Sequence, residues 1–143
     1  MKYTLSNEIN GSLSHVAEKI IAPDGAKEWT EGLQNTEQID GQFGKVGSKR
    51  NLNYLFNNKE MVIIESIVEQ NLPNQIKFAY DSKMGQNIVE LIFEQVSENL
   101  VKQTSHTTME LKGIMKWLGF ALKPMFKKQS IKYMTAFKKY AEQ

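Results

Sequence analysis

The feature that most constrains the fold is a central region, residues 37–112, in which turn-forming residues recur at intervals of about 8 to 12. Between these breaks the segments are rich in β-branched and aromatic residues. Evenly spaced short strands separated by residues that tolerate left-handed or fixed backbone angles are typical of an antiparallel meander. We therefore predict six consecutive strands, with breaks at residues 41–47, 57–58, 71–74, 84–86 and 97–99.

The residues before this region predict one more strand and two short helices. Apolar and polar residues alternate from Lys2 to Asn10, which is the period of a half-buried strand. A first short helix is expected to begin at Ser12 or Ser14 and to stop before Pro23. A second is expected from residue 24 to about residue 33.

After Gly113 the apolar residues recur with a helical period up to the C-terminus. Phe126, Tyr133, Met134, Phe137 and Ala141 fall on one side of such a helix, and most of the lysines fall elsewhere. Pro124 is expected to kink this helix or to divide it, because proline cannot donate a backbone hydrogen bond. The region thus predicts a long amphipathic helix.

This order of elements predicts an α+β fold of the helix-grip type. About seven antiparallel strands would form a curved sheet wrapped around the long C-terminal helix, with two short helices after the first strand. A chain of 143 residues with 41% hydrophobic residues can form one sizeable core. We therefore expect a single domain spanning residues 1–143.

With this element order, the sequence resembles the START-like (SRPBCC) superfamily, and within it a small bacterial branch similar to polyketide cyclases and dehydrases. The resemblance covers nearly the whole chain and rests on six local segments: 29–33 (WTEGL), 61–67 (MVIIESI), 72–73 (LP), 113–116 (GIMK), 126–130 (FKKQS) and 137–138 (FK). It implies a cavity of at least a few hundred Å³ between sheet and C-terminal helix, with its entry near the short helices. Such a cavity would bind a hydrophobic or amphipathic molecule, lipid-like or polyketide-like.

Large apolar side chains and a few polar ones are distributed over every wall that this cavity would have. An apolar stripe fills space equally well without a ligand, so each aromatic residue could instead simply pack the core. The candidate ligand-binding residues are Trp29, Leu33, Tyr54, Glu65, Phe78, Tyr80, Phe93, Ser105, Thr107, Met109, Trp117, Phe120, Phe126, Tyr133 and Phe137.

Glu65 admits two interpretations. If residues 57–58 form a two-residue hairpin turn, Tyr54 faces Met61, and Arg50 faces Glu65 across the strand pair. A carboxylate in an apolar cavity could be a general base or a ligand anchor. The alternative, which we favour, is a structural ion pair with Arg50.

Residues 102–110 present two different faces. Gln103, Ser105, Thr107 and Met109 form one, and the more charged set containing His106 forms the other, which should face water. We therefore expect Ser105 and Thr107 to hydrogen-bond the polar end of a ligand, and His106 to lie on the solvent side. A bulge near residues 97–99 would reverse this assignment relative to the preceding strand.

The composition argues against several classes of site. The chain has no cysteine, its two histidines lie about ninety residues apart, and it contains no HExxH motif, so we expect no metal and no cofactor. Residues 41–47 lack the spacing of a phosphate-binding loop and are interpreted as a flexible loop at the cavity mouth. With neither an apolar run of about 18 residues nor a signal peptide, we expect no transmembrane segment and a cytoplasmic location.

Charge is divided unevenly along the chain. Residues 1–111 contain ten Lys or Arg and fifteen Asp or Glu, whereas residues 112–143 contain eight Lys and one Glu. The only arginine, Arg50, is far from these lysines in sequence, and we expect no nucleic-acid partner.

Three functions remain open from the sequence. The first is binding of a hydrophobic or amphipathic small molecule. The second is a cyclase, dehydratase or hydrolase reaction in the same cavity, in which Glu65 or the pair Ser105 and Thr107 would act on the substrate. The third is docking of the basic C-terminal helix on an acidic partner or an anionic membrane. Whether the chain is an enzyme, and its oligomeric state, are left open.

Overall fold

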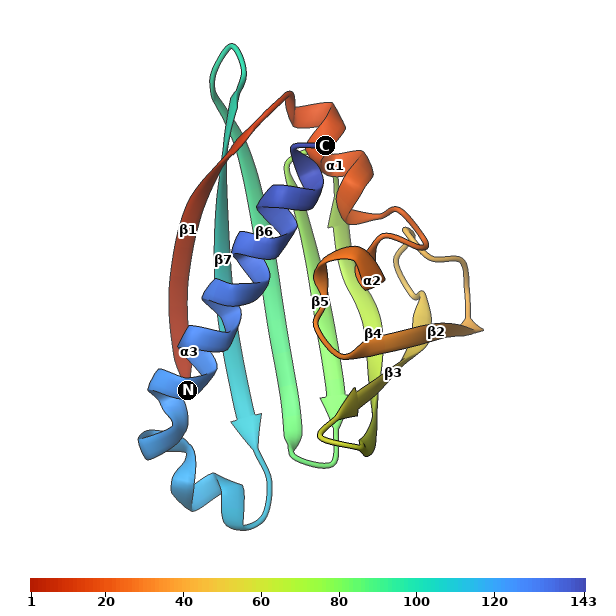
Figure 1. Cartoon of the computed structure of the whole chain (residues 1–143), viewed down its shortest axis with the longest axis vertical. Coiled ribbons are helices and arrows are strands. Elements are labelled where there is room, and N and C mark those ends of the chain that lie inside the picture. Colours follow the sequence, from red (N-terminus) through yellow and green to blue (C-terminus); the bar gives the residue numbers. More distant parts are fainter.

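One antiparallel sheet and one long helix account for most of the chain in the computed structural model, which describes residues 1–143 (Figure 1). The seven strands are arranged in the order β1-β7-β6-β5-β4-β3-β2. The helix α3 runs diagonally across one face of the sheet, and α1 and α2 lie near its C-terminal end (Figure 1). The elements, in chain order, are β1 (Lys2–Asn10), α1 (Leu13–Ile20), α2 (Ala26–Trp29), β2 (Leu33–Asp40), β3 (Lys49–Phe56), β4 (Lys59–Asn71), β5 (Gln75–Ser82), β6 (Gly85–Ser97), β7 (Leu100–Leu111) and α3 (Ile114–Ala141).

The predicted helix-grip architecture is confirmed, including the number of strands, and the breaks in the meander lie within one or two residues of the predicted positions: Gly85 and Gln86, for example, already belong to β6. The hairpin between β3 and β4 is a two-residue turn in which Asn57 and Asn58 have φ values of 49° and 65°. Asparagine tolerates this left-handed region better than most residues. The turn sets the predicted register, in which Tyr54 pairs with Met61 and Arg50 with Glu65.

The prediction for residues 24–33 is wrong in part. The helix α2 covers only Ala26–Trp29, and Leu33 is the first residue of β2 rather than the end of a helix. Thr30 already has extended backbone angles, and Gly32 has a φ of 84°, a value that suits glycine and cannot continue a helix. The chain therefore turns at Gly32, and Leu33 pairs with Tyr54 across the strands.

Pro124 lies inside α3, which is a single helix of 28 residues. The ribbon bends between its N-terminal turns, which extend beyond the sheet, and the long segment that crosses the sheet (Figure 1). A bend is expected here because proline removes one backbone hydrogen bond and its ring clashes with the preceding turn. No helix of the structure is both long and apolar enough to cross a membrane.

The main core lies where the C-terminal half of α3 meets the sheet and α1. Phe137, which is 1% exposed, packs there with Ile9, Val16 and Phe93. Burying an aromatic side chain of this size stabilises the fold by about 2–3 kcal/mol. A second, smaller cluster of Leu33, Leu52 and Tyr54 lies on β2 and β3. The helix α3 contributes side chains to the main core but none to the second cluster, and a space remains between α3 and the sheet beside this second cluster.

Candidate functional site

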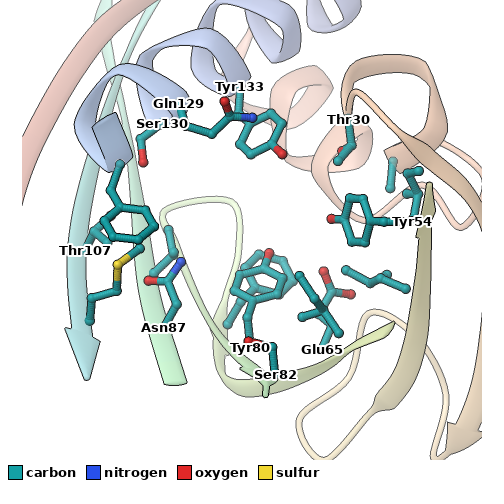
Figure 2. A pocket seen from close by; sticks show the side chains of 18 of the residues that line it. Thr30, Tyr54, Glu65, Tyr80, Ser82, Asn87, Thr107, Gln129, Ser130 and Tyr133 are labelled. Atoms are coloured by element: carbon teal, nitrogen blue, oxygen red, sulfur yellow. The ribbon is translucent and has the colours of Figure 1, made fainter. Parts of the chain in front are cut away.

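A cavity of about 680 Å³ lies between the sheet and α3 (Figure 2). Its lining comes from α1, α2, α3 and the six strands β2 to β7, with side chains such as Leu33, Phe78 and Met109. Of the 34 lining residues, 22 are hydrophobic. This volume falls within the range of about 300 to 1,000 Å³ typical of small-molecule sites.

The structure brings twelve of the fifteen predicted site residues together around this cavity. They come from seven different elements, so only the tertiary fold makes them neighbours. These twelve are Trp29, Leu33, Tyr54, Glu65, Phe78, Tyr80, Ser105, Thr107, Met109, Phe126, Tyr133 and Phe137.

The other three residues do not line the cavity, and their assignment to it is wrong. Phe93 is 0% exposed and is packed in the main core rather than on the cavity wall. Trp117 and Phe120 are 85% and 95% exposed. They lie on the turns of α3 that precede Pro124, where their side chains are left in solvent.

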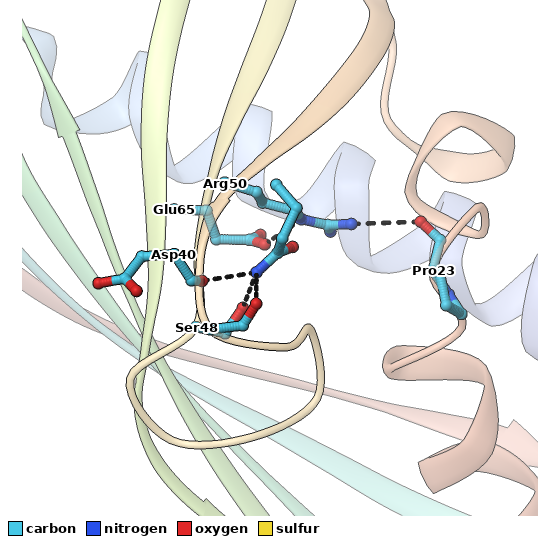
Figure 3. Close-up of polar contacts among 7 residues, drawn as sticks. Pro23, Asp40, Ser48, Arg50 and Glu65 are labelled. Atoms are coloured by element: carbon cyan, nitrogen blue, oxygen red, sulfur yellow. Dashed lines mark hydrogen bonds and ion pairs between the residues drawn. The ribbon is translucent and has the colours of Figure 1, made fainter.

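A buried ion pair forms part of the cavity wall at β3 and β4. The Nε of Arg50 donates to Oε1 of Glu65 at 2.6 Å, and the two side chains are only 5% and 7% exposed. Arg50 also donates through Nη1 to the backbone oxygen of Pro23 at 3.2 Å (Figure 3), and its guanidinium lies 3.7 Å from the centroid of the Phe43 ring. The predicted ion pair is confirmed, and its carboxylate also lines the cavity.

The loop 41–47 is held in place by polar contacts. Gln38 donates through Nε2 to the backbone oxygen of Asp40 at 2.7 Å and to Oγ of Ser48 at 3.0 Å (Figure 3). Gln70 donates to the backbone oxygen of Gly44 at 3.0 Å. The predicted position at the cavity is confirmed by Phe43, which lines it, while the contacts place the loop firmly against the sheet.

Burial shifts the titration of the polar groups around Glu65. It raises the pKa of Glu65, and the charge and hydrogen bond of Arg50 offset part of this effect. Burial likewise raises the pKa of Tyr54 and of Tyr80 well above the ordinary value for tyrosine, and the nearby Glu65 carboxylate adds to the shift. Both tyrosines are neutral hydroxyls at physiological pH; the hydroxyl of Tyr80 donates to the Glu65 carboxylate, and that of Tyr54 can donate a hydrogen bond to a ligand.

A second polar zone lies on β6 and β7. Gln103, Ser105 and Thr107 are 2%, 4% and 3% exposed and line the cavity, while His106 between them is exposed, as the predicted face assignment requires. The side-chain oxygens of Gln103 and Asn87 are buried and have no hydrogen-bond partner within the protein. Buried amide oxygens are normally paired, so these two acceptors are available for a donor in the cavity.

The helix α3 supplies polar groups to the roof of the cavity. Gln129, Ser130 and Tyr133 line it (Figure 2), and Ser130 is fixed by a 2.7 Å hydrogen bond to the hydroxyl of Tyr3 on β1. Gln129 and Ser130, together with Asn87, were not among the predicted site residues. Gln129 and Ser130 lie one helical turn from Phe126 and Tyr133, and this spacing could have identified them.

Several solved structures share this architecture over nearly the whole chain. A conserved protein from Geobacillus kaustophilus has a TM-score of 0.79 and 14% identity, covering 99% of this chain and 95% of its own. Ara h 8.0201 has a TM-score of 0.77 and 13% identity, covering 99% and 98%. A major latex-like protein from ginseng, Panax ginseng, has a TM-score of 0.68 and 15% identity, covering 100% and 98%.

The chain has the START-like (SRPBCC) fold. No protein-family model matches the sequence, and a search of curated proteins finds no match. At identities of 13% to 15% these similarities show the START-like fold alone, and a fold does not by itself imply a function. The function must therefore be argued from the residues that line the cavity.

Proposed function

We propose that this START-like domain binds an amphipathic small molecule with an apolar, lipid-like or polyketide-like body in the cavity between sheet and α3. The observation that carries the proposal is the cavity itself, about 680 Å³ in volume and lined mainly by hydrophobic side chains. Apolar walls favour the transfer of an apolar ligand from water, by about 25 cal/mol for each Å² that is buried.

Polar groups at two opposite walls indicate where the polar parts of the ligand would lie. Thr107 and Asn87 lie on one side of the cavity, and Glu65 and Tyr54 lie on the other (Figure 2). The unpartnered oxygens of Asn87 and Gln103 require a donor, such as a hydroxyl or amine of the ligand. The Arg50–Glu65 pair neutralises its own charges, which favours an uncharged polar group beside it.

The proposal is tested by the emission of one tryptophan. Trp29 lines the cavity and packs edge-on against Phe137 at a centroid distance of 5.3 Å, whereas Trp117 is 85% exposed. In the variant Trp117→Phe, Trp29 is the only indole left. Titration with long-chain alcohols, fatty acids and hydroxylated polycyclic aromatics is expected to change its emission and to raise the melting temperature, since a ligand that binds only the folded state stabilises it.

The matched control is Trp29→Phe, in which Trp117 reports only on the exposed end of α3. Its emission is expected to stay unchanged at ligand concentrations that saturate the first variant and lie below those at which the compounds form aggregates. If no compound of the panel changes either the Trp29 emission or the melting temperature, the proposed binding function loses its support.

A second candidate, a cyclase, dehydratase or hydrolase reaction in this cavity, is favoured by one observation. Glu65 lines the cavity with a raised pKa beside Tyr80, and acid–base catalysts are often tuned in this way. Turnover of a polyketide-like substrate that is lost in Glu65→Gln, while binding of the substrate persists, would support catalysis. Binding without turnover in the wild-type protein would support the binding function alone.

A further inference from the structure

The first turns of α3 present an apolar surface that nothing in the fold covers. Phe120, Trp117 and Ile114 are 95%, 85% and 75% exposed, and they are the three most exposed large hydrophobic side chains of the chain. Leu118 and Met125 are 46% and 54% exposed on the same helix. We call these five residues the α3 apolar patch.

The patch follows the geometry of the helix. Ile114, Trp117, Leu118 and Met125 are spaced as i, i+3, i+4 and i+11, so they share one face, and Phe120 lies beside it. The opposite side of the same turns packs inward, where Gly119 is buried against Leu111. One side of these turns therefore packs against the rest of the protein, and the other side exposes apolar side chains to solvent.

The charges on this part of α3 have one sign, although Glu110 of β7 borders the same surface hollow as Lys116, Phe120 and Lys123. No Asp or Glu occurs between Leu111 and Ala141. Five lysines on or next to these turns take part in no ion pair, in contrast to Lys132 and Lys138, which pair with Glu31 and Glu142 farther along α3. The five are Lys112, Lys116, Lys123, Lys127 and Lys128.

We infer that this end of α3 docks on an anionic lipid membrane, with Trp117 and Phe120 inserted at the level of the headgroups. An exposed apolar face containing Trp, Phe and Leu, flanked by lysines, is the chemistry of helices that lie in a membrane interface. Lysines are attracted to the negative surface potential of anionic lipids. A second copy of this chain would instead bring the same five lysines against themselves, which disfavours self-association through the patch.

The patch adjoins the cavity. Met125 belongs to the patch and also lines the cavity, and Phe126, the next residue, lines it as well. A helix docked in this way would hold this side of the cavity at the lipid surface. The inference does not depend on the proposed ligand-binding function, because binding to vesicles requires no occupant in the cavity.

The test is flotation of the full chain with vesicles, either of phosphatidylcholine alone or of phosphatidylcholine mixed with phosphatidylglycerol. We expect binding to the anionic vesicles that weakens as salt is added, because screening shortens the range of the lysine charges. In Trp29→Phe, which retains only Trp117, the emission is expected to shift to shorter wavelength with anionic vesicles, since the indole leaves water.

The variant Trp117→Ser/Phe120→Ser is expected to bind anionic vesicles at least about tenfold more weakly, because it removes two large apolar side chains from the docking face. Its matched control is Val46→Ser/Val62→Ser, since these valines are 62% and 51% exposed outside α3. The control is expected to bind like the wild type. All four side chains are exposed, so both variants should keep the wild-type melting temperature.

Three results would overturn the inference. The wild-type chain could fail to float with anionic vesicles, or the Trp117→Ser/Phe120→Ser variant could bind them as tightly as the wild type. Sedimentation equilibrium could also show a dimer that this variant abolishes, without vesicle binding, which would assign the patch to a second copy of the chain.

Discussion

Replacing Glu65 by Gln tests the buried ion pair of the cavity wall. The substitution keeps the size of the side chain and removes its charge, so the guanidinium of Arg50 stays buried at 5% exposure without a counter-charge. Its remaining contacts are the backbone oxygen of Pro23 at 3.2 Å and the face of the Phe43 ring at 3.7 Å. Neither the carbonyl oxygen nor the aromatic ring carries a negative charge that could replace the carboxylate.

The expected magnitude follows from the burial of both partners. Removing one member of a buried pair costs about 3–5 kcal/mol, whereas the same change in an exposed pair costs less than about 1 kcal/mol. Since Glu65 and Arg50 are both less than one-tenth exposed, we expect Glu65→Gln to lower the free energy of unfolding by about 3 kcal/mol. We expect Arg50→Met to lower it by at least as much, because it also loses the contacts to Pro23 and Phe43.

The assay is urea unfolding of the wild type, Glu65→Gln, Arg50→Met and the double variant. At an m-value of about 1 to 3 kcal/mol/M, the Glu65→Gln midpoint should fall by about 1 to 3 M. The double variant should recover most of the loss, because it leaves no unpaired charge. Additive effects near zero, with constant m-values, would refute the ion pair as a stabilising element and favour a role of Glu65 in ligand chemistry.

Three further predictions concern local features of the fold. Tyr54 and Tyr80 have raised pKa values, so their neutral hydroxyls favour the folded chain. Their contribution to the free energy of unfolding should be complete below about pH 10 and should be lost as the pH rises above it. Urea midpoints and tyrosinate absorbance measured against pH check this. Gly85→Ala should cost at least about 3 kcal/mol in urea unfolding, because its φ is 142° and the new Cβ would lie 2.0 Å from the backbone oxygen of Glu110; an unchanged midpoint would contradict this. Asn58→Val should cost about 1–2 kcal/mol at a φ of 65°, whereas Asn58→Gly should stay within about 0.5 kcal/mol of the wild type, and equal midpoints for the two would refute the reasoning.

The strand region was predictable from the sequence because its signals are local. Alternation with a period of two residues assigns faces, and turn residues such as Asn57 and Asn58 set the register between neighbouring strands. The facing of Arg50 and Glu65 and the inward orientation of Ser105 both followed from this rule. The helix-grip order of elements followed in turn.

The wrong predictions concern residues whose surroundings depend on tertiary packing, which a local sequence pattern does not show. The spacing of Trp117 and Phe120 shows a helical face but does not show whether anything packs on it, and the turns before Pro124 extend beyond the sheet. Phe93 points inward as its strand period indicates, yet it meets closely packed neighbours and no cavity. Leu33 was assigned to the end of the second short helix, but the extended backbone of Thr30 and the positive φ of Gly32 end that helix before it.

The central claim, that the cavity holds a small amphipathic molecule, is tested most directly by native mass spectrometry of the chain purified from its own host. Two variants at neighbouring positions of β7 provide the comparison. Ser105→Phe places a large side chain in the cavity, and Thr104→Phe places the same side chain on the opposite face of the strand.

We predict a mass increment of one small molecule on the wild type and on Thr104→Phe, and its loss in Ser105→Phe. All three proteins must be folded, as judged from their melting temperatures. The claim would be contradicted by a wild-type chain that carries no bound molecule and also acquires none from the ligand panel, or by an increment that Ser105→Phe retains in full.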